Sequence, residues 1–238
     1  MSTLGVRLVD QALRLALPGR CAFCLAPGEA GQPWCSACFE TLPWNLPACP
    51  CCAEPQPAGA LAGRLCGRCL ARPPGFDLTL APLRYQGEVA ALMQRFKFHA
   101  SPRAGSVLLA LFLARLVLVE PPQALLAVPL HPRRARERGF DQADWLARHL
   151  ARRLGIPLIR ARRRRDTRSQ RGLDRLERGR NLRHAFVVDR RLPPRVALVD
   201  DVMTTGATLN ALALACRRAR AEDIEAWAMA RTPGGQLC

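Results

Sequence analysis

The sequence is poor in lysine and in aromatic residues. Lys97 is its single lysine among 36 basic residues, Tyr85 is its single tyrosine, and aromatic residues make up 5% of 238 positions. So few aromatic side chains argue against nucleic-acid binding by extensive base stacking. The formal net charge of +17 favours a polyanionic partner. The excess of arginine, alanine, proline and leucine is also typical of a GC-rich genome. The charge alone therefore does not establish a polyanionic partner.

Long uninterrupted apolar runs are also missing. The most apolar stretch, residues 106–119, contains Arg115 and is too short to span a bilayer. Residues 1–21 predict a short amphipathic helix, and Arg7, Asp10 and Arg14 break the apolar centre that a signal peptide needs. We therefore expect no transmembrane segment and a cytoplasmic protein. An apolar content of 49% is enough for a packed core in one sizeable domain plus a small one.

Cysteine, in contrast, is abundant and clustered. Nine of the eleven cysteines fall within residues 21–69, and eight of these form four CxxC pairs separated by 10, 10 and 13 residues. Each pair presents two thiolates to one ion, and two pairs complete a tetrahedral zinc shell. The simplest assignment is two Zn²⁺ sites, with Cys21, Cys24, Cys35 and Cys38 at the first and Cys49, Cys52, Cys66 and Cys69 at the second. The spacing also leaves an interleaved pairing open.

Disulfides are the alternative for these cysteines, and they would require an oxidising compartment. Four CxxC pairs in some fifty residues also argue against a redox motif. Cys51 could compete with Cys49 or Cys52, whereas Cys216 is expected in an apolar helix face. A zinc shell without an open position is structural, and it would supply folding energy to a segment rich in proline and glycine.

Residues 76–238 have the pattern of an α/β domain, and residues 1–75 are expected to form the N-terminal helix and the zinc module. Short apolar runs alternate with helical periodicity, which predicts βαβ units and a mainly parallel sheet. We expect strands or a hairpin at 76–85 and strands at 124–130, 156–159, 195–201 and 224–230. Helices are expected at 88–98, 104–119, 140–155 and 208–221.

One stretch of this domain, VALVDDVMTTGAT at residues 196–208, carries chemistry. Asp200 and Asp201 follow a buried strand, and ligands of parallel sheets bind beyond the carboxyl ends of strands. The threonine-rich turn, residues 204–208, leads into a helix whose N-terminal amides can hold an anion. Carboxylates accept hydrogen bonds from vicinal hydroxyls. The Walker and GxGxxG patterns of other phosphate-binding sites are absent. The stretch therefore predicts a site that binds a sugar diol and the phosphate next to it.

The stretch resembles the motif of type I phosphoribosyltransferases that binds 5-phosphoribosyl-1-pyrophosphate (PRPP). The resemblance implies that Asp200 and Asp201 hold the ribose hydroxyls, with Mg²⁺ accompanying PRPP. It further implies a 5-phosphate loop formed by Thr204, Thr205, Gly206, Ala207 and Thr208. The cysteine module, YQGEVAALMQRFKF (85–98), VPLHPRRARERGFDQADWLA (128–147) and RRDTRSQRGLDRLERGRNLRHAF (164–186) resemble the ComF family of competence-associated proteins.

This resemblance suggests further contacts. Leu130 and His131 would form a pyrophosphate loop, although an ordinary proline-containing turn is the alternative. Asp141 departs from the asparagine usual after RGF, which would weaken an anion contact or simply cap a helix. Residues 158–195 carry fourteen arginines against four acids, a local +10, and could form a lid or a nucleic-acid arm. The candidate contacts are Arg138, Arg168, Gln170, Arg171, Arg178, Asn181 and Lys97.

Three functions stay open at this point. The family implies a PRPP-binding factor that handles incoming single-stranded DNA during natural transformation, together with the DNA-uptake machinery. A nucleobase-salvage phosphoribosyltransferase that releases pyrophosphate is the second, and a catalytically silent PRPP sensor is the third. The sequence shows no convincing nucleophile, so transfer would depend on positioning and electrostatic stabilisation. Neither the acceptor nor the oligomeric state follows from the sequence.

Overall fold

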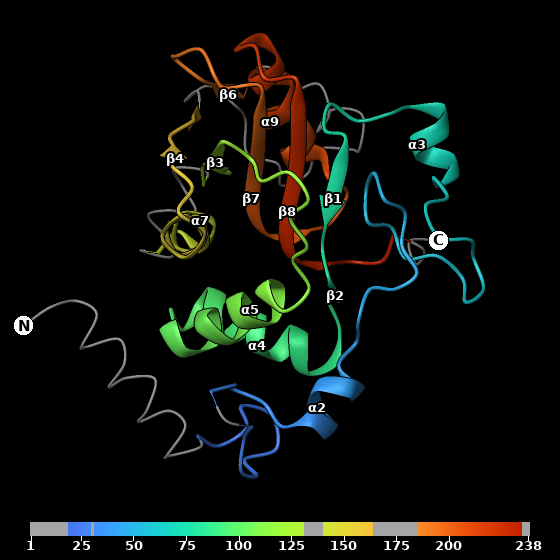
Figure 1. Cartoon of the computed structure of the whole chain (residues 1–238), viewed down its shortest axis with the longest axis vertical. Coiled ribbons are helices and arrows are strands. Elements are labelled where there is room, and N and C mark those ends of the chain that lie inside the picture. Colours follow the sequence, from blue (N-terminus) through green and yellow to red (C-terminus); the bar gives the residue numbers. More distant parts are fainter. Residues whose placement is uncertain (1–18, 30, 131–139, 164–184, 235–238) are drawn as a thin grey trace, which may run out of the picture.

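A parallel six-stranded sheet forms the centre of the molecule (Figure 1). The computed structural model describes residues 19–29, 31–130, 140–163 and 185–234. The sheet has the order β1 (Leu78–Leu80), β8 (Asp223–Arg231), β7 (Arg195–Met203), β3 (Ala124–Ala127) and β4 (Leu158–Ile159), and β2 (Leu83–Arg84) also pairs with β8. Every one of these pairs is parallel. The predicted α/β fold with a parallel sheet is confirmed.

Helices cover both faces of the sheet. Helix α9 (Ala207–Arg218) packs on one face, while α4 (Gly87–Phe98), α5 (Pro102–Leu113) and α7 (Gln142–Leu154) pack on the other. Successive side chains of β7 point to opposite faces, as the pleat of a strand requires. Val196 and Leu198 lie in the core under α9, and Ala197 and Val199 lie in the core under the other three helices.

Most predicted elements are present, with shifted ends. The helix expected at 104–119 begins at Pro102, where the Ser101 hydroxyl caps it by accepting from the amide of Ala104 at 3.3 Å, and it ends at Leu113. The run that follows is not buried, since Val117 and Val119 are 83% and 90% exposed. The prediction was wrong there because apolar composition did not distinguish a helix from an exposed connection.

The strand predictions were wrong in three places. The run 124–130 forms a strand only as far as Ala127, two residues before Pro129, which has no amide hydrogen for the ladder. The run 76–85 divides into β1 and β2, which both pair with β8 rather than with each other. The strand expected to end at Asp201 continues to Met203 and so includes both carboxylates.

The cysteine-rich segment contributes to the hydrophobic cores on both sides of the sheet. Cys38 lies within α2 (Ser36–Thr41) and Cys35 is its N-cap residue, while Cys21 belongs to the core of α4 and α5. Cys49, Cys52 and Cys69 lie in the core of α9, and Cys69 belongs to α3 (Gly67–Ala71). In Figure 1, α2 lies below α4 and α5, and α3 lies beyond β1. The boundary between residues 75 and 76 stays a prediction.

Two further features lie outside the main sheet. Strands β5 (Arg162–Arg163) and β6 (Phe186–Val187) form a small antiparallel pair within the arginine-rich region. Within the described part of the chain, none of the helices combines the length and the apolar character that crossing a membrane requires. The expected N-terminal helix lies outside the described residues.

Candidate ligand site and metal centres

Two carboxylates lie side by side near the carboxyl end of β7. Both are half-buried, and each accepts a hydrogen bond from the next backbone amide: Asp201 N donates to Asp200 Oδ1 at 2.8 Å, and Val202 N donates to Asp201 Oδ1 at 2.6 Å. Burial raises the pKa of Asp200 to about 8, and the Asp201 carboxylate adds to the rise. A protonated Asp200 donates one hydrogen bond while the other oxygens of the pair accept, so this partly desolvated pair suits the hydroxyl groups of a ligand.

The single lysine of the chain faces this pair. Lys97 Nζ, near the end of α4, lies 3.2 Å from Asp201 Oδ2, and both side chains are about one-seventh exposed. The ammonium lies 5.9 Å from the centre of the Tyr85 ring. Gln142 of α7 fixes this end of α4, because its buried Nε2 donates to the Lys97 carbonyl at 3.1 Å. The structure thus brings together the predicted Lys97 and the predicted carboxylates.

The threonine loop joins β7 to the N-terminus of α9. Gly206 is the N-cap residue and has φ +77°, and a Cβ there would lie 2.7 Å from the Met203 methyl group. Glycine is therefore required both by the backbone conformation and by the close packing. Thr205 Oγ1 accepts from the amide of Ala207 at 3.3 Å, and Thr204 and Thr205 are exposed. The amides at this helix start can receive an anion.

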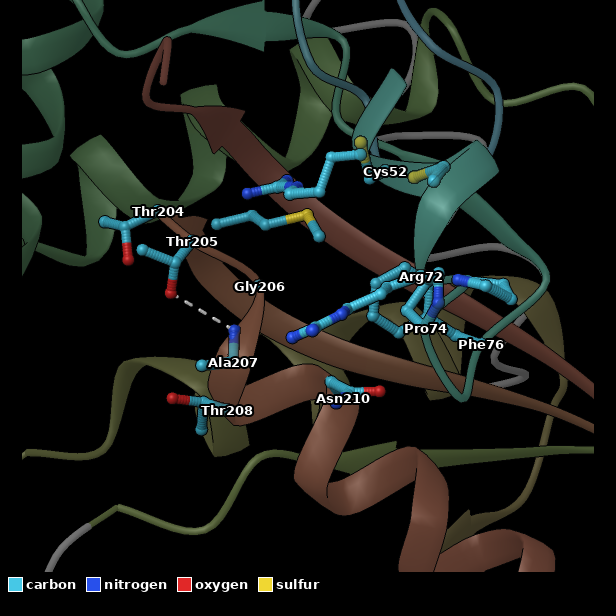
Figure 2. Close-up of a pocket in the computed structure, with 14 residues that line it drawn as sticks. Cys52, Arg72, Pro74, Phe76, Thr204, Thr205, Gly206, Ala207, Thr208 and Asn210 are labelled. Carbon is cyan, nitrogen blue, oxygen red and sulfur yellow. Dashed lines mark hydrogen bonds between the residues drawn. The ribbon is translucent and has the colours of Figure 1, made fainter. Parts of the chain in front are cut away.

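A pocket of about 390 Å³ opens beside this loop (Figure 2). Residues 203–208 line it on one side, together with Asn210 of α9. Arg68, Cys69, Arg72, Pro73, Pro74 and Phe76 line the other side, as does Cys52. The second cysteine cluster thus forms part of the wall of the pocket that contains the predicted phosphate loop.

A buried arginine ties this wall to the loop. Arg231, at the end of β8, is 0% exposed, and its guanidinium donates to the carbonyls of Cys52 at 3.1 Å and Met203 at 3.2 Å. It also contacts the Thr204 carbonyl and the Glu54 carboxylate. Burial lowers the pKa of Arg231, while the Glu54 carboxylate opposes the shift. A buried charge must be paired in this way to be tolerated.

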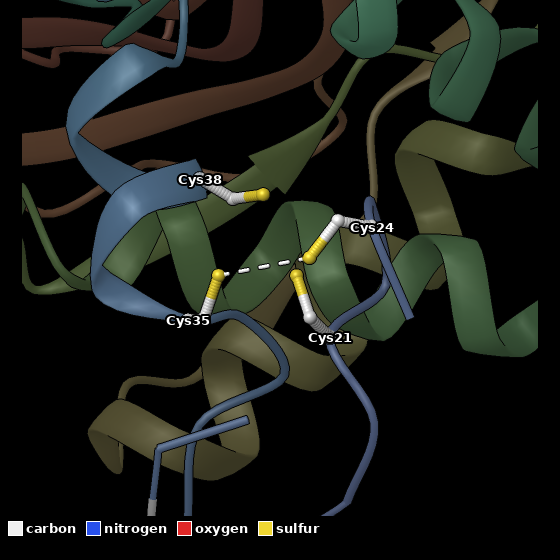
Figure 3. A group of neighbouring side chains, drawn as sticks. All are labelled: Cys21, Cys24, Cys35 and Cys38. Atoms are coloured by element: carbon white, nitrogen blue, oxygen red, sulfur yellow. Dashed lines mark hydrogen bonds between the residues drawn. The ribbon is translucent and has the colours of Figure 1, made fainter. Parts of the chain in front are cut away.

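The cysteine sulfurs gather in two groups of four, in the simplest of the predicted pairings. Within the described residues, one group joins the first two CxxC pairs and the other joins the last two, with all four ligand atoms within 4.8 Å of one another. Cys24 and Cys35 sulfurs lie 3.8 Å apart (Figure 3), and Cys52 and Cys66 sulfurs 3.6 Å apart. A tetrahedral shell with Zn–S bonds of about 2.3 Å has edges of about 3.8 Å, so both groups fit zinc.

In the first group, the pKa values of two neighbouring thiols move in opposite directions. Burial and the hydrogen-bonding thiols around it raise the pKa of Cys38 to about 12. Burial also acts to raise the pKa of Cys21, but the backbone amides of Cys24, Phe23 and Cys35 outweigh it and lower this pKa to about 6. Four neighbouring sulfurs cannot all ionise without a positive charge between them, and a bound metal deprotonates its thiol ligands.

Known proteins combine the same features. The double zinc ribbon domain family matches residues 12–70. Competence protein F of Haemophilus influenzae is 36% identical over 209 residues, which cover 83% of this chain and 90% of that protein. The DNA utilization protein YhgH of Salmonella typhimurium is 32% identical over 236 residues, which cover 92% of this chain and 99% of that protein. The chain belongs to the ComF family.

Solved structures give a weaker likeness to this ComF chain. A purine phosphoribosyltransferase from Pyrococcus horikoshii aligns with 63% of the chain and 73% of its own length, at 16% identity and a TM-score of 0.32. The adenine phosphoribosyltransferase of Leishmania tarentolae aligns with 65% of the chain and 92% of its own length, at 13% identity and a TM-score of 0.35. These values are too low to support an argument about ligands.

Only some of the remaining predicted contact residues lie within the described part of the chain. Leu130 is half-buried, and its backbone amide interacts with the Asp141 carboxylate. Asp141 caps α7 by accepting from the amide of Asp144 at 3.0 Å, a role that asparagine would fill equally well. Burial raises the pKa of Asp141. The other candidates lie outside the described residues: His131, Arg138, Arg168, Gln170, Arg171, Arg178 and Asn181.

Sequence reasoning missed the residues that join the cysteine clusters to the sheet. Arg231 ends an ordinary apolar run, and only burial distinguishes it from the other arginines. Asn45 is equally hidden: its buried Nδ2 donates to the carbonyls of Ala53 and Ala81, at 2.9 and 3.1 Å. Arg72 and Asn210 enter the site through folding alone. No local pattern around these residues would have indicated their roles.

Proposed function

We propose that this ComF chain binds PRPP and works in the use of external DNA. Asp200 and Asp201 would accept hydrogen bonds from the ribose hydroxyls. The 5-phosphate would lie against Thr204–Thr208. The observation that carries the proposal is the junction of the two half-buried carboxylates with a loop that opens a helix and lines a pocket. The relatives named for competence and DNA utilization support the biological role.

Mg²⁺ would accompany the ligand rather than occupy a cage of its own. PRPP carries a pyrophosphate and a phosphate, and Mg²⁺ is usually held by substrate phosphates together with one or two carboxylates. The paired carboxylates supply negative charge and oxygen atoms of the right kind. Lys97 would balance part of this charge, and it would keep Asp201 in one orientation while the ligand enters.

The proposal is tested by titrating PRPP and Mg²⁺ into the zinc-loaded full chain. We expect binding to wild type and a loss of at least tenfold in D200N/D201N, because neutral amides accept hydrogen bonds less strongly than carboxylates. E222Q, which removes an exposed carboxylate at the opposite end of the sheet, is the control and should bind like wild type. Equal affinity in wild type and D200N/D201N would refute the site.

Turnover is a separate question, settled by pyrophosphate release. In transfer, an acceptor atom would bond to the anomeric carbon of PRPP while the bond to pyrophosphate breaks and pyrophosphate departs. Release assayed with PRPP alone, with nucleobases and with single-stranded DNA separates three cases. Release that requires a nucleobase indicates salvage, and release that requires DNA indicates a DNA-directed reaction. Binding without release indicates a PRPP sensor.

Direct contact with single-stranded DNA is the second part of the proposal. In the described residues, the β5–β6 pair exposes Arg162, which forms an ion pair with Asp189 at 2.6 Å, and Arg190 and Arg191 are exposed nearby in the chain. Binding through such arginines would weaken steeply as salt rises, because it releases counterions from the phosphates. A fluorescence titration with labelled oligonucleotide between 50 and 200 mM salt measures this slope, and an absent slope would count against contact through arginines.

A further inference from the structure

The far wall of the threonine-loop pocket belongs to the second cysteine cluster. Arg72 follows directly on α3, the helix that carries Cys69, and it faces the loop across the pocket (Figure 2). Arg72 thus presents a cation on the wall of the pocket opposite the threonine loop.

Several contacts fix the segment after Arg72 onto α9, the same helix that begins at the loop. The amide of Gly75 donates to Asn210 Oδ1 at 2.6 Å, and Arg217 Nε donates to the Gly75 carbonyl at 3.1 Å. Arg217 also holds both carboxylate oxygens of Asp77 at 2.7 Å. Pro73 and Pro74 stiffen the short connection, because each fixes its own φ. Both walls of the pocket are thus attached to the same helix, α9.

The two arginines of this wall have different partners. Arg68 lies 4.0 Å from the Glu54 carboxylate and hydrogen-bonds to the Cys52 sulfur, which raises its pKa against the effect of burial. The guanidinium of Arg68 therefore already has partners in and beside the second cysteine cluster. Arg72 is exposed, and among the described residues its side chain has no ion pair or hydrogen bond. Its five donors are available to a ligand in the pocket.

On this basis, and resting on the proposed function, we propose that Arg72 binds the 5-phosphate of the sugar phosphate that the threonine loop holds. The phosphate would lie between the amides at the start of α9 and the guanidinium supplied by the cysteine cluster. Arginine suits this task because its planar fork matches two phosphate oxygens at once. The second metal centre would then set the affinity of the site for its ligand, in addition to stabilising the fold.

The test compares ligands that differ in their phosphates. Wild type, R72Q and R64Q are loaded with zinc and titrated by calorimetry with PRPP, ribose 5-phosphate and inorganic pyrophosphate. R64Q is the matched control, since Arg64 is exposed in the same cysteine-rich segment and does not line the pocket. We expect R72Q to bind PRPP and ribose 5-phosphate about tenfold more weakly, with pyrophosphate unchanged, because a charge-assisted phosphate contact is lost.

The outcomes separate this inference from the proposed function. If wild type binds PRPP and R72Q binds ribose 5-phosphate as well as R64Q does, the role of Arg72 is refuted while the PRPP site stands. If R72Q weakens pyrophosphate equally, the residue acts through general charge and the inference also fails. Wild type that binds neither sugar phosphate refutes the proposed function itself. Zinc content and melting temperature, measured on each variant, should match wild type.

Discussion

At the residue scale, the most consequential side chain is one that the sequence gives no reason to notice. Arg231 is the only fully buried arginine among the described residues. Its partners are one carboxylate, that of Glu54, and the carbonyls of Cys52, Met203, Thr204 and Thr232. These partners offset the cost of burying its charge. Removing it would leave the half-buried Glu54 without its main counter-charge.

We expect R231A to lower the free energy of unfolding by about 3–5 kcal/mol, the range for breaking a buried ion pair from one side. Denaturant unfolding followed by circular dichroism gives this value. R218A, which removes an exposed arginine from the end of α9, should change it by less than about 0.5 kcal/mol. If both variants unfold alike, Arg231 does not hold the loop and the cluster together.

The raised pKa of the Asp200 carboxyl leads to a second prediction, which concerns how stability depends on pH. Its folded pKa of about 8 lies above the ordinary value of 3.8, so ionisation at this site opposes folding. The cost is absent below about pH 4, grows as the pH rises towards 8 and is constant above. With zinc bound, and in buffer without Mg²⁺ or ligand, D200N should gain melting temperature over wild type progressively between pH 5 and 8. A difference in melting temperature between D200N and wild type that does not change with pH would contradict the raised pKa.

At the scale of elements, the sequence was most informative where periodicity and chemistry agreed. Helix α7 ends at Leu154 before Gly155, whose φ of +68° matches the left-handed end expected of a glycine there. The cysteine spacings likewise predicted two zinc sites, and the structure forms the simplest of the pairings that the spacing left open. Prediction was weaker for short apolar runs such as 124–130, because the apolar pattern continues past Ala127 while Pro129 cannot donate to the ladder.

The start of α7 yields a prediction about the proposed PRPP site. Asp141 caps the helix, interacts with the Leu130 amide and acts to raise the pKa of Asp200. D141N should keep the cap, because asparagine is an equally good N-cap, and should bind PRPP several-fold more tightly because one repelling charge is gone. D141A should lose about 1 kcal/mol of stability. Calorimetry and thermal unfolding measure the two effects, and weaker PRPP binding by D141N would refute this reading.

At the scale of the whole molecule, the two cysteine clusters serve different parts of the fold. The first packs against α4 and α5 on one face of the sheet, and the second packs against α9 and the threonine loop on the other. Spacing predicts four ligands per ion but not the face on which each ion lies. That placement follows from tertiary contacts such as those of Asn45 and Arg231, which link residues far apart in the chain.

This placement predicts that losing one zinc differs in effect from losing the other. C24S and C66S each remove one thiolate, from the first and the second cluster, and each should reduce the zinc content from two ions to about one per chain. Both should melt at a lower temperature, because metal binding supplies folding free energy. Only C66S should lose PRPP affinity, since only the second cluster lines the pocket. Equal loss of PRPP binding in both variants, at matched zinc content and at a temperature where both are folded, would show that the metals act through global stability alone.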